Sequence, residues 1–529
     1  MLELKKLEHL LTQGKITRRE FLARTSALGF TAAVFPALLT TPARAATPKK
    51  GGRLRIGTTG ASAAESLDAS GMTNTMTQVL NWQIRNSLVE IDSDSNAIPE
   101  LAESWESTPD AKKWIFKIRR GVEFHNGKTL DAEDVIFSIN HHRGEDSKSA
   151  AKPTVDQIKE IKAEDKYTVV VTLKGGNADF AYLLSAFHLL IVPNGTKNFN
   201  EGIGTGGYIL ESWEPGVNSL VKRNPNYWKE GRAHFDEVET IAIADVTART
   251  SALRTGQIDV MNRCDPKTVD LLGEEPGIQV IETHGPRHQT MPMLTDIPPY
   301  DNNDVRLALK YAIDRENMVK MIFRGHGSVG NDQPISPGAY RYFASELPQR
   351  VYDPDKARYY IKKAGLKDHT FKLHGSQSPF VGAIDMALLY KKHAERAGIK
   401  IDVVKEPDDG YWSNVWMKKD WSFCLWAGRA TEDWMLSMVY EDGAPWNDTH
   451  WKHERFNKLL KEARAELDKA KRHEMYGEMQ GIVRDKGGVV IPTFSSILEA
   501  ATTKLRYDKV ATNFEWDGCR LPERWWFES

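Results

Sequence analysis

Hydrophobic and polar residues alternate along this chain in ways that predict both strands and helices. Trp114, Phe116 and Ile118 would lie on one face of a short strand, because side chains in an extended chain point alternately to its two sides. The stretch from Tyr167 to Leu173 is rich in β-branched residues and predicts a buried strand. Another strand begins at Leu54-Arg55-Ile56 and leads into a loop rich in Gly, Ser and Thr.

Helices are predicted where apolar residues recur every three or four positions. Asp131 precedes one helix as its N-cap, with Asp134 as the capping-box partner. Asp353 precedes another, with Pro354 in the first turn and Gly365 beyond the end. A third helix has one buried face, formed by Val305, Ala308, Leu309, Ala312 and Ile313. Strands and helices in this irregular order indicate an α/β fold.

Length and composition narrow the class of protein. The chain has 529 residues, which favours two or three domains. Hydrophobic residues make up 40% and charged residues 27%, as in ordinary globular proteins. The net charge is −1, so no overall field attracts nucleic acid or an anionic membrane. We therefore expect no nucleic-acid partner.

The first 45 residues have the features of an export leader. A basic segment containing Arg18-Arg19 is followed by an uncharged stretch, from residue 25 to residue 43. Ala43-Arg44-Ala45 then supplies a small-residue cleavage site. Arg18-Arg19 before Phe21-Leu22 resembles a twin-arginine (Tat) signal. We expect cleavage near Ala45 and a periplasmic protein, and an uncleaved N-terminal membrane anchor is the alternative.

Other chemical signals are weak. The three cysteines, Cys264, Cys424 and Cys519, are far apart in the sequence; one disulfide could form, but three buried thiols fit export of a folded chain better. Five residues separate Gly121 from Gly127, which precedes Lys128, whereas a phosphate-binding loop has four residues between its two glycines. No zinc-type ligand spacing or nucleophile motif occurs. We expect no cofactor, no metal site and no catalytic residue.

Tryptophans concentrate in one short window around an arginine. Arg429 stands between Trp426 and Trp434, with Glu432 and Asp433 just beyond it. Many large rings beside charged groups suit a cleft that stacks on a ligand and orients it, although core packing uses some of them. The other tryptophans of the window are Trp412, Trp416 and Trp421.

Several blocks in order along the chain resemble one known family. They are LAESW at residues 101–105, FKIRRGVEFHNGK at 116–128, AEDVIFS at 132–138, GTGGYIL at 204–210, RNPNYW at 223–228, PPY at 298–300 and AIDR at 312–315. Together they resemble the family 5 extracellular solute-binding proteins, which serve ABC importers of peptides and nickel. Gly207 stands where the family usually has proline.

The resemblance implies a two-lobed α/β periplasmic binding protein (type II, cluster C-like), whose first lobe carries an extra subdomain. Lobe I would comprise residues 46–90, 200–300 and 505–529, the extra subdomain residues 91–199, and lobe II residues 301–504. The ligand would lie between lobes that close about a hinge.

The same resemblance implies a function. We expect a monomeric receptor that delivers a short peptide, an opine-like compound or a sugar conjugate to an ABC permease and its ATPase, without chemistry on the ligand. A nickel-chelate receptor and a secreted enzyme on the same fold are the alternatives, since a fold does not fix a function.

One residue departs from the peptide-binding pattern. The family block that corresponds to Trp426-Ala427-Gly428-Arg429 usually ends in an aspartate that holds the α-amino group of a peptide. An unpaired ammonium beside a guanidinium is strongly disfavoured, so Arg429 predicts a ligand with an anionic or hydroxyl-rich end, such as an acidic opine-like conjugate, a sugar acid or a sugar phosphate. The alternative is that Glu432 or Asp433 pairs with Arg429 and one of these acids still receives an amine.

Further residues are expected at the cleft by the same resemblance. Arg287 or His288 would contact ligand beside the lobe crossing, although a solvent-facing arginine at a strand end is an equal alternative. The complete predicted binding set is Arg429, Trp426, Gly428, Glu432, Trp412, Arg287, His288 and Tyr208.

Overall fold

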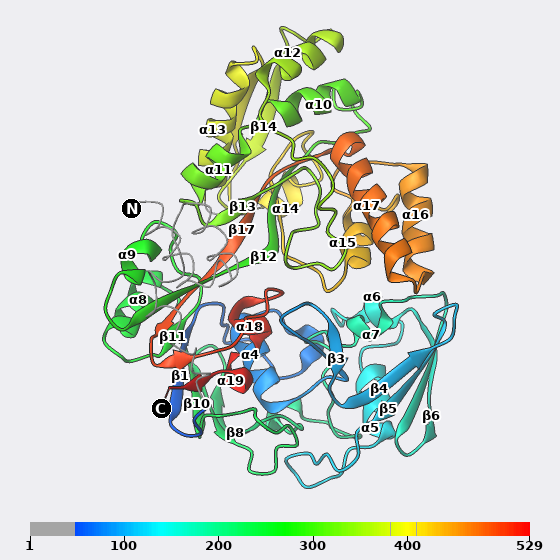
Figure 1. Ribbon diagram of the computed structural model, residues 1–529, viewed down its shortest axis with the longest axis vertical. Helices are drawn as coiled ribbons and strands as arrows, with labels where there is room; N and C mark the ends of the chain where they lie inside the picture. The colour runs from blue at the N-terminus through cyan, green and yellow to red at the C-terminus, as the bar shows by residue number, and fades with distance from the viewer. Residues whose placement is uncertain (1–47, 381, 409, 529) are drawn as a thin grey trace, which may run out of the picture. The chain divides into compact units, whose positions relative to one another are not determined.

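Two groups of hydrophobic cores organise the chain. A computed structural model describes residues 48–380, 382–408 and 410–528 (Figure 1), so the expected leader lies outside the described residues. We call the first lobe the residues that pack around Leu54, Phe116 and Leu253, and the second lobe those that pack around Trp421 and Tyr476. In the described part of the chain, no helix is long and apolar enough to cross a membrane.

The first lobe combines two large sheets with short helices. Its elements up to residue 183 are β1 (Arg53–Thr58), α4 (Thr75–Ile84), β2 (Val89–Ile91), β3 (Ala97–Pro99), β4 (Ala102–Ser107), β5 (Lys113–Ile118), α5 (Ala132–Asn140), α6 (Lys152–Val155), β6 (Ile158–Asp165), β7 (Thr168–Leu173) and α7 (Phe180–Leu183). The later ones are β8 (Tyr208–Glu214), β9 (Asn218–Arg223), β10 (Glu237–Ala242), α8 (Val246–Arg254), β11 (Val260–Met261), α9 (Val269–Gly273), β18 (Leu505–Arg506), α18 (Glu515–Cys519), α19 (Leu521–Arg524) and β19 (Trp526–Phe527).

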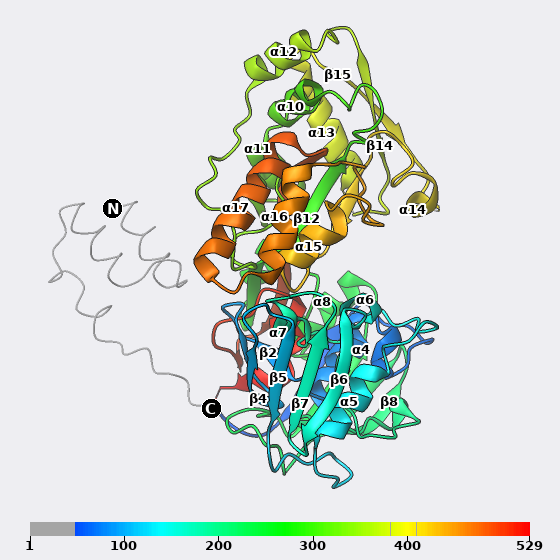
Figure 2. The ribbon, with the colours of Figure 1, turned by 90° about the vertical axis from the view of Figure 1, so that its right-hand side faces the viewer.

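The antiparallel sheet β4-β5-β7-β6 lies beside α5 in the first lobe (Figure 2). Trp114, Phe116 and Ile118 alternate into its core, and β7 is buried along almost its whole length. The strand predictions here are confirmed. The N-cap of α5 is also confirmed, because Asp131 and Asp134 form a complete capping box.

The second lobe is richer in helices. Its elements are α10 (Asn303–Tyr311), α11 (Arg315–Ile322), β13 (Gly327–Val329), α12 (Pro354–Lys363), β14 (Thr370–Gly375), α13 (Ala383–Glu395), β15 (Lys400–Lys405), α14 (Tyr411–Asn414), β16 (Cys424–Trp426), α15 (Glu432–Val439), α16 (Glu454–Ala465) and α17 (Lys469–Lys486). The predicted helices are confirmed as α10 and α12, although α10 ends at Tyr311 and Ile313 lies beyond it. The Asp353 carboxylate accepts from the backbone N–H of Lys356.

Two long strands, β12 (Ile278–Pro292) and β17 (Val489–Thr502), belong to both lobes. They pair antiparallel within the sheet β16-β12-β17-β11-β1-β10-β9-β8. Along β12, Ile281 packs in a first-lobe core and Met291 in a second-lobe core. Along β17 the change falls between Phe494 and Leu498. The chain therefore passes between the lobes within this strand pair (Figure 1), while the domain boundaries at residues 90, 200, 300 and 505 stay predictions.

Close backbone contact explains one glycine of the 204–210 block. A Cβ atom on Gly206 would lie 2.3 Å from the carbonyl oxygen of Gln83 and 2.4 Å from the carbonyl carbon of Ile84. Both are rigid backbone atoms at the end of α4, so neither can move aside easily. The small residue here lets the segment before β8 pass directly over the end of this helix.

We expect Gly206→Ala to lower the free energy of unfolding by about 1–3 kcal/mol, the usual cost of overpacking. Urea denaturation followed by far-UV circular dichroism measures it. Gly175→Ala is the matched control, because a Cβ atom there meets nothing within 4 Å. Equal stability of the two variants would contradict the proposed close contact.

Candidate ligand-binding site

A bulge in the shared strand pair lies where the two lobes meet. His284 of β12 pairs with Ser496 of β17, and the next paired residue, His288, faces Phe494. Gly285, Pro286 and Arg287 therefore stand opposite a single residue and bulge out of the ladder. Such bulges redirect side chains and are common beside binding sites.

Arg287 projects from this bulge and is exposed. No hydrogen bond or ion pair to its side chain is formed within the described residues. Burial of the surrounding region and the positive charge of Arg263 lower the pKa of Arg287, and Glu515 only partly offsets this effect. The guanidinium is thus reachable by a ligand and has no counter-ion of its own.

Arg429 lies just beyond β16, which pairs with β12 next to the bulge. Its guanidinium carbon lies 5.8 Å from the ring centre of Trp426 and 6.0 Å from that of Trp434. Nη1 donates to the carbonyl oxygens of Ala427 and Gly428 at 3.0 and 2.9 Å. Burial lowers the pKa of Arg429. Among the described residues, no carboxylate pairs with this positive charge.

The alternative pairing of Arg429 with Glu432 or Asp433 is wrong, because both acids are engaged elsewhere. Glu432 is fully buried and accepts from the backbone N–H of Tyr342 at 2.8 Å. It also lies 3.3 Å from Arg341. Asp433 pairs with Arg464 at 3.0 Å. Neither carboxylate is left to receive an amine beside Arg429.

The remaining predicted site residues fall into two groups. Gly428 is half-buried beside Pro286, and Trp412 is 45% exposed, so both are open to solvent. Tyr208, by contrast, has no exposed surface, and its hydroxyl donates to the carbonyl oxygen of Pro522 in the first-lobe core. The expectation that Tyr208 lines the cleft is corrected, because β8 turns this ring inward.

His288 is also buried completely. Its Nδ1 lies 2.9 Å from the carbonyl oxygen of Pro286, and burial lowers the pKa of the ring to about 4. It is therefore a neutral core histidine behind the bulge. The prediction that His288 contacts ligand directly is corrected. Glu432 is excluded from ligand contact in the same way, by its burial against Tyr342.

Trp426 is part of a chain of rings that leads to the surface. Its centre lies 6.1 Å from that of Trp416, which lies 5.6 Å from that of Trp412. The indole N–H groups of Trp416 and Trp426 both donate to the buried Asp448, at 3.2 and 3.3 Å. Burial raises the pKa of Asp448 to about 7, and these two hydrogen bonds only partly oppose the rise.

An ion-pair cluster that the sequence did not reveal joins the two lobes. Its elements α7 and α17 lie away from β12 and β17 (Figure 1). Asp179, at the start of α7 in the first lobe, receives two hydrogen bonds from Arg472 of α17, at 2.8 and 2.6 Å. Arg341 of the second lobe donates to the same carboxylate at 2.8 Å and lies 3.7 Å above the ring of Tyr182. Burial alone would raise the pKa of Asp179, but the two guanidinium charges outweigh it and lower the pKa to about 2. We call Asp179, Arg341 and Arg472 the latch.

Two neighbouring residues, Tyr340 and Arg341, contact Arg429 and the latch respectively. Tyr340 accepts from the backbone N–H of Arg429 at 2.9 Å through its hydroxyl. The next residue, Arg341, bonds both Asp179 and Glu432. Residues 340–342 therefore contact both the backbone of Arg429 and the latch. The sequence offered only a weak signal for this, an arginine flanked by two tyrosines.

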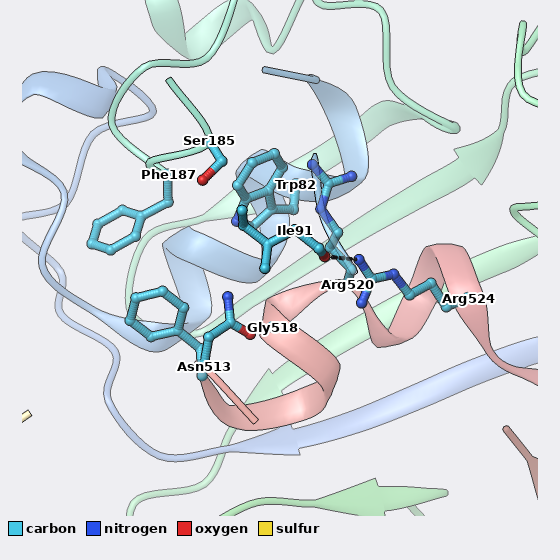
Figure 3. Close-up of a pocket in the computed structure, with 9 residues that line it drawn as sticks. Trp82, Ile91, Ser185, Phe187, Asn513, Gly518, Arg520 and Arg524 are labelled. Carbon is cyan, nitrogen blue, oxygen red and sulfur yellow. Dashed lines mark hydrogen bonds between the residues drawn. The ribbon is translucent and has the colours of Figure 1, made fainter. Parts of the chain in front are cut away.

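A small pocket with about 20 Å³ of free volume lies within the first lobe (Figure 3). Phe187 and Phe514 meet edge to face on one side, with ring centres 5.6 Å apart, and Trp82 stands on the other. Arg520 stacks on Trp82 at 3.9 Å. Arg520 is paired with Glu100 and Glu523, and its neighbour Arg524 with Glu90 and Asp517. These charges are therefore neutralised within the protein, and the pocket has room for about one water molecule.

The pocket borders an unusual turn. Trp516, Asp517 and Gly518 of α18 all have left-handed backbone, with φ of 52°, 58° and 70°. Non-glycine residues in this region cost about 1–2 kcal/mol each. The buried carboxylate of Asp517 supports the turn by accepting from the backbone N–H of Ala511 at 2.7 Å and from Trp525 at 3.2 Å. Such strain is concentrated at binding sites in many proteins.

Cys264, Cys424 and Cys519 are all free and buried in the described part of the chain, as expected for small core residues. No group of three or more His, Cys, Asp or Glu side chains in the described ranges could hold a metal ion.

Two lobes that share a strand pair, with unpaired arginines at the crossing and ionic contact away from it, define a two-lobed binding protein. The model of the bacterial extracellular solute-binding proteins, family 5, matches residues 96–450, and the chain belongs to this family. It is a solute receptor of the kind that serves ABC importers, whose partners are a ligand and a membrane permease.

Known relatives agree with this assignment. Di/tripeptide-binding protein 1 of Pseudomonas aeruginosa is 25% identical over 429 residues, which cover 74% of this chain and 79% of that protein. The ABC transporter-associated periplasmic binding protein DppA of Helicobacter pylori, solved with the peptide STSA, has the same fold, with a TM-score of 0.73, 22% identity and coverage of 91% and 99%. The binding protein AgaA of A. tumefacien R10, solved with agropinic acid, gives a TM-score of 0.72, 23% identity and coverage of 90% and 99%.

We expect Asp179→Asn to favour the open arrangement of the lobes, because it leaves the buried guanidinium of Arg472 without a carboxylate and leaves Arg341 with Glu432 alone. Breaking a buried pair typically costs about 3–5 kcal/mol, and the closed form should become at least tenfold less populated. Small-angle X-ray scattering of the ligand-free protein measures the change in radius of gyration. Glu478→Gln is the control, since it removes an exposed pair with Arg455. An unchanged scattering curve for Asp179→Asn would show that the latch does not hold the lobes together.

Asp448 gives the protein a pH-dependent stability. Its folded pKa, about 7, lies above its ordinary value of 3.8, so the protonated side chain stabilises the folded state. This contribution to the free energy of unfolding is fully present below about pH 4 and is lost as the pH rises through 7. Burial raises the pKa values of the neighbouring Cys424 and Tyr440, so both stay neutral in this range.

We expect Asp448→Asn to gain ~2 kcal/mol of unfolding free energy relative to the unmodified protein between pH 5 and pH 7, since one pH unit corresponds to at most about 1.4 kcal/mol. Urea denaturation at several pH values, followed by tryptophan fluorescence, measures this. The control is Asp442→Asn, at an acid that is 42% exposed. If the unfolding free energies of the Asp448 variant and the unmodified protein changed in parallel with pH, Asp448 would not hold a proton in the folded state.

Proposed function

We propose that the protein is the periplasmic receptor of an ABC importer for a small ligand with an acidic end, such as an opine-like compound or a sugar conjugate. The observation that carries this proposal is the guanidinium of Arg429, which has no carboxylate partner in the described residues. A guanidinium bonds carboxylate or phosphate bidentately and stacks on rings, and Trp426 and Trp434 flank it. A bound anion would compensate the charge.

The relatives support a receptor function and indicate which kinds of ligand this fold can bind. AgaA was solved with agropinic acid and DppA with a peptide, so this fold accepts both kinds of compound. In this chain Glu432 and Asp433 are already paired with Arg341 and Arg464. This favours an acidic compound over a peptide whose free amine needs a carboxylate.

The other functions have less support. A nickel-chelate receptor would use a histidine at the binding site, and the candidate, His288, is buried and hydrogen-bonded to Pro286. Members of the family are binding proteins, and we propose that this chain likewise performs no chemistry on its ligand. We further propose a monomer, exported through the twin-arginine pathway and cleaved near Ala45.

Two measurements test the proposed ligand class. Native mass spectrometry of protein purified gently from the periplasm should show a discrete added mass that fragmentation identifies as an acid. Isothermal titration should then show binding of agropinic acid, as a probe, but not of the dipeptide Ala-Ala.

We expect Arg429→Gln to weaken binding of the acidic probe roughly 10- to 100-fold, the loss expected for one charge-assisted interaction of about 1.5–3 kcal/mol. Isothermal titration measures the dissociation constant of each variant. Arg455→Gln is the control, because that arginine makes an exposed pair with Glu478 at the start of α16. Tight binding of Ala-Ala that is unaffected by Arg429→Gln would refute the acidic-ligand proposal.

A further inference from the structure

A single buried carboxylate holds the indole ring beside Arg429 together with a second indole ring. Oδ2 of Asp448 accepts from the indole N–H groups of Trp416 and Trp426, at 3.2 and 3.3 Å. The two rings meet at 66°, with their centres 6.1 Å apart. Because one oxygen atom serves both donors, the position of Asp448 fixes the two rings relative to each other.

The neighbours of Asp448 in the chain hold this carboxylate in place. On one side, the side-chain amide of Asn447 donates to the carbonyl oxygen of Trp451 at 2.8 Å. On the other side, the carbonyl oxygen of Thr449 accepts from the backbone N–H of Thr295 at 2.8 Å. Asp448 therefore stands between two anchored residues, and a precise binding site needs support of this kind.

Trp426 lies between Asp448 and Arg429. Its indole N–H bonds Asp448, while the guanidinium carbon of Arg429 lies over its ring, 5.8 Å from the ring centre. The ring of Trp446 packs against it with centres 5.9 Å apart, and Trp426 is buried. A turn of the Trp426 ring would break its bond to Asp448 and would move the surface on which the guanidinium lies.

Asp448 is a costly residue for the support of two rings. It is buried, and none of the described lysine, arginine and histidine residues forms an ion pair with it. Burial raises the pKa values of the nearby Cys424 and Tyr440, so these groups are neutral. Burying a carboxylate without a cation destabilises a fold, whereas a neutral oxygen would also accept from indole N–H groups. Local costs of this kind are concentrated at functional sites.

We propose that Asp448 is a positioning residue of the ligand-binding site, which holds Trp426 where the guanidinium of Arg429 lies over its ring. This role rests on the proposed function in one respect, since that function assigns the acidic end of the ligand to Arg429. Asp448 itself does not touch the ligand. Its contribution to affinity therefore depends on Arg429, whereas a carboxylate that only stabilised the lobe would act with or without that arginine.

Nuclear magnetic resonance tests the positioning without any ligand. The Nε–H group of Arg429 lies beside the rings of Trp426 and Trp434, so its chemical shift reports their ring currents, and its loss in Arg429→Gln assigns it. We expect Asp448→Ala to shift this resonance and to move the indole N–H resonance of Trp426 upfield, because the bond to the carboxylate is lost. Asp448→Asn keeps an oxygen acceptor and should leave both resonances close to their original positions.

A double-mutant cycle tests the link to affinity. Isothermal titration with agropinic acid is run on the unmodified protein, Asp448→Ala, Arg429→Gln and the double variant. We expect Asp448→Ala to weaken binding roughly tenfold when Arg429 is present, as for residues coupled in one network, and to have no further effect in Arg429→Gln. Asp448→Asn should bind like the unmodified protein, and so should the control Asp442→Ala, at an acid that is 42% exposed.

Circular dichroism and thermal melting show whether each variant is folded. If Asp448→Ala does not fold, Asp448→Ser takes its place in both experiments, because the serine hydroxyl is too short to reach both indole N–H groups.

The failures of the two proposals differ. If agropinic acid binds but the Arg429 resonance does not move, or Asp448→Ala weakens binding equally with and without Arg429, the positioning role is wrong and the acidic-ligand receptor stands. If the resonance moves, but agropinic acid does not bind and native mass spectrometry finds a ligand that is not an acid, the acidic ligand is wrong and the support of Arg429 by Asp448 stands. If the resonance does not move and no acid binds, both proposals are wrong.

Discussion

The pairing of β12 with β17 is the constraint on which the rest of this structure depends. The register runs from Ile278 opposite Thr502 to Pro292 opposite Val489 and passes through the cores of both lobes. Backbone hydrogen bonds hold such a ladder regardless of side chain, so the two lobes share one continuous element. The three-residue bulge is one of two local breaks in that ladder, and it presents Arg287 at the point where the lobes meet.

Charge pairing decides which groups near the lobe crossing remain for a ligand. Near Arg429, the acids Glu432 and Asp433 are taken by arginines of the second lobe. Between the lobes, Asp179 is held by Arg341 and Arg472. Charges are also paired inside the first lobe near Trp82. There Lys229 and Arg520 share three buried glutamates, Glu90, Glu100 and Glu523. Arg287 and Arg429 have no acidic partner among the described residues, and neither do Arg85, Arg249 and Arg306, which bond carbonyl or amide oxygens inside the protein.

The coupling between site and latch follows from adjacency along the chain. Tyr340 and Arg341 are neighbours, yet one contacts Arg429 and the other contacts Asp179 in the opposite lobe. Arg429 and the latch therefore contact neighbouring residues of one segment. A ligand shifts the equilibrium between open and closed lobes only through the form it binds better.

The sequence by itself determined the local elements and the class of protein. Caps such as Asp131 and Asp353, and alternation such as that of Trp114, Phe116 and Ile118, act over a few residues and need no tertiary information. It also located Arg429 and Arg287, because a charged residue at a position compared with a family pattern can be recognised from the sequence without the fold. Only the tertiary structure decided that His288 and Tyr208 are buried while Arg287 is exposed, because the bulge and the inward face of β8 set those directions. It also decided that Glu432 pairs with Arg341, 91 residues away, since a charge pairs with the neighbour that folding brings to it.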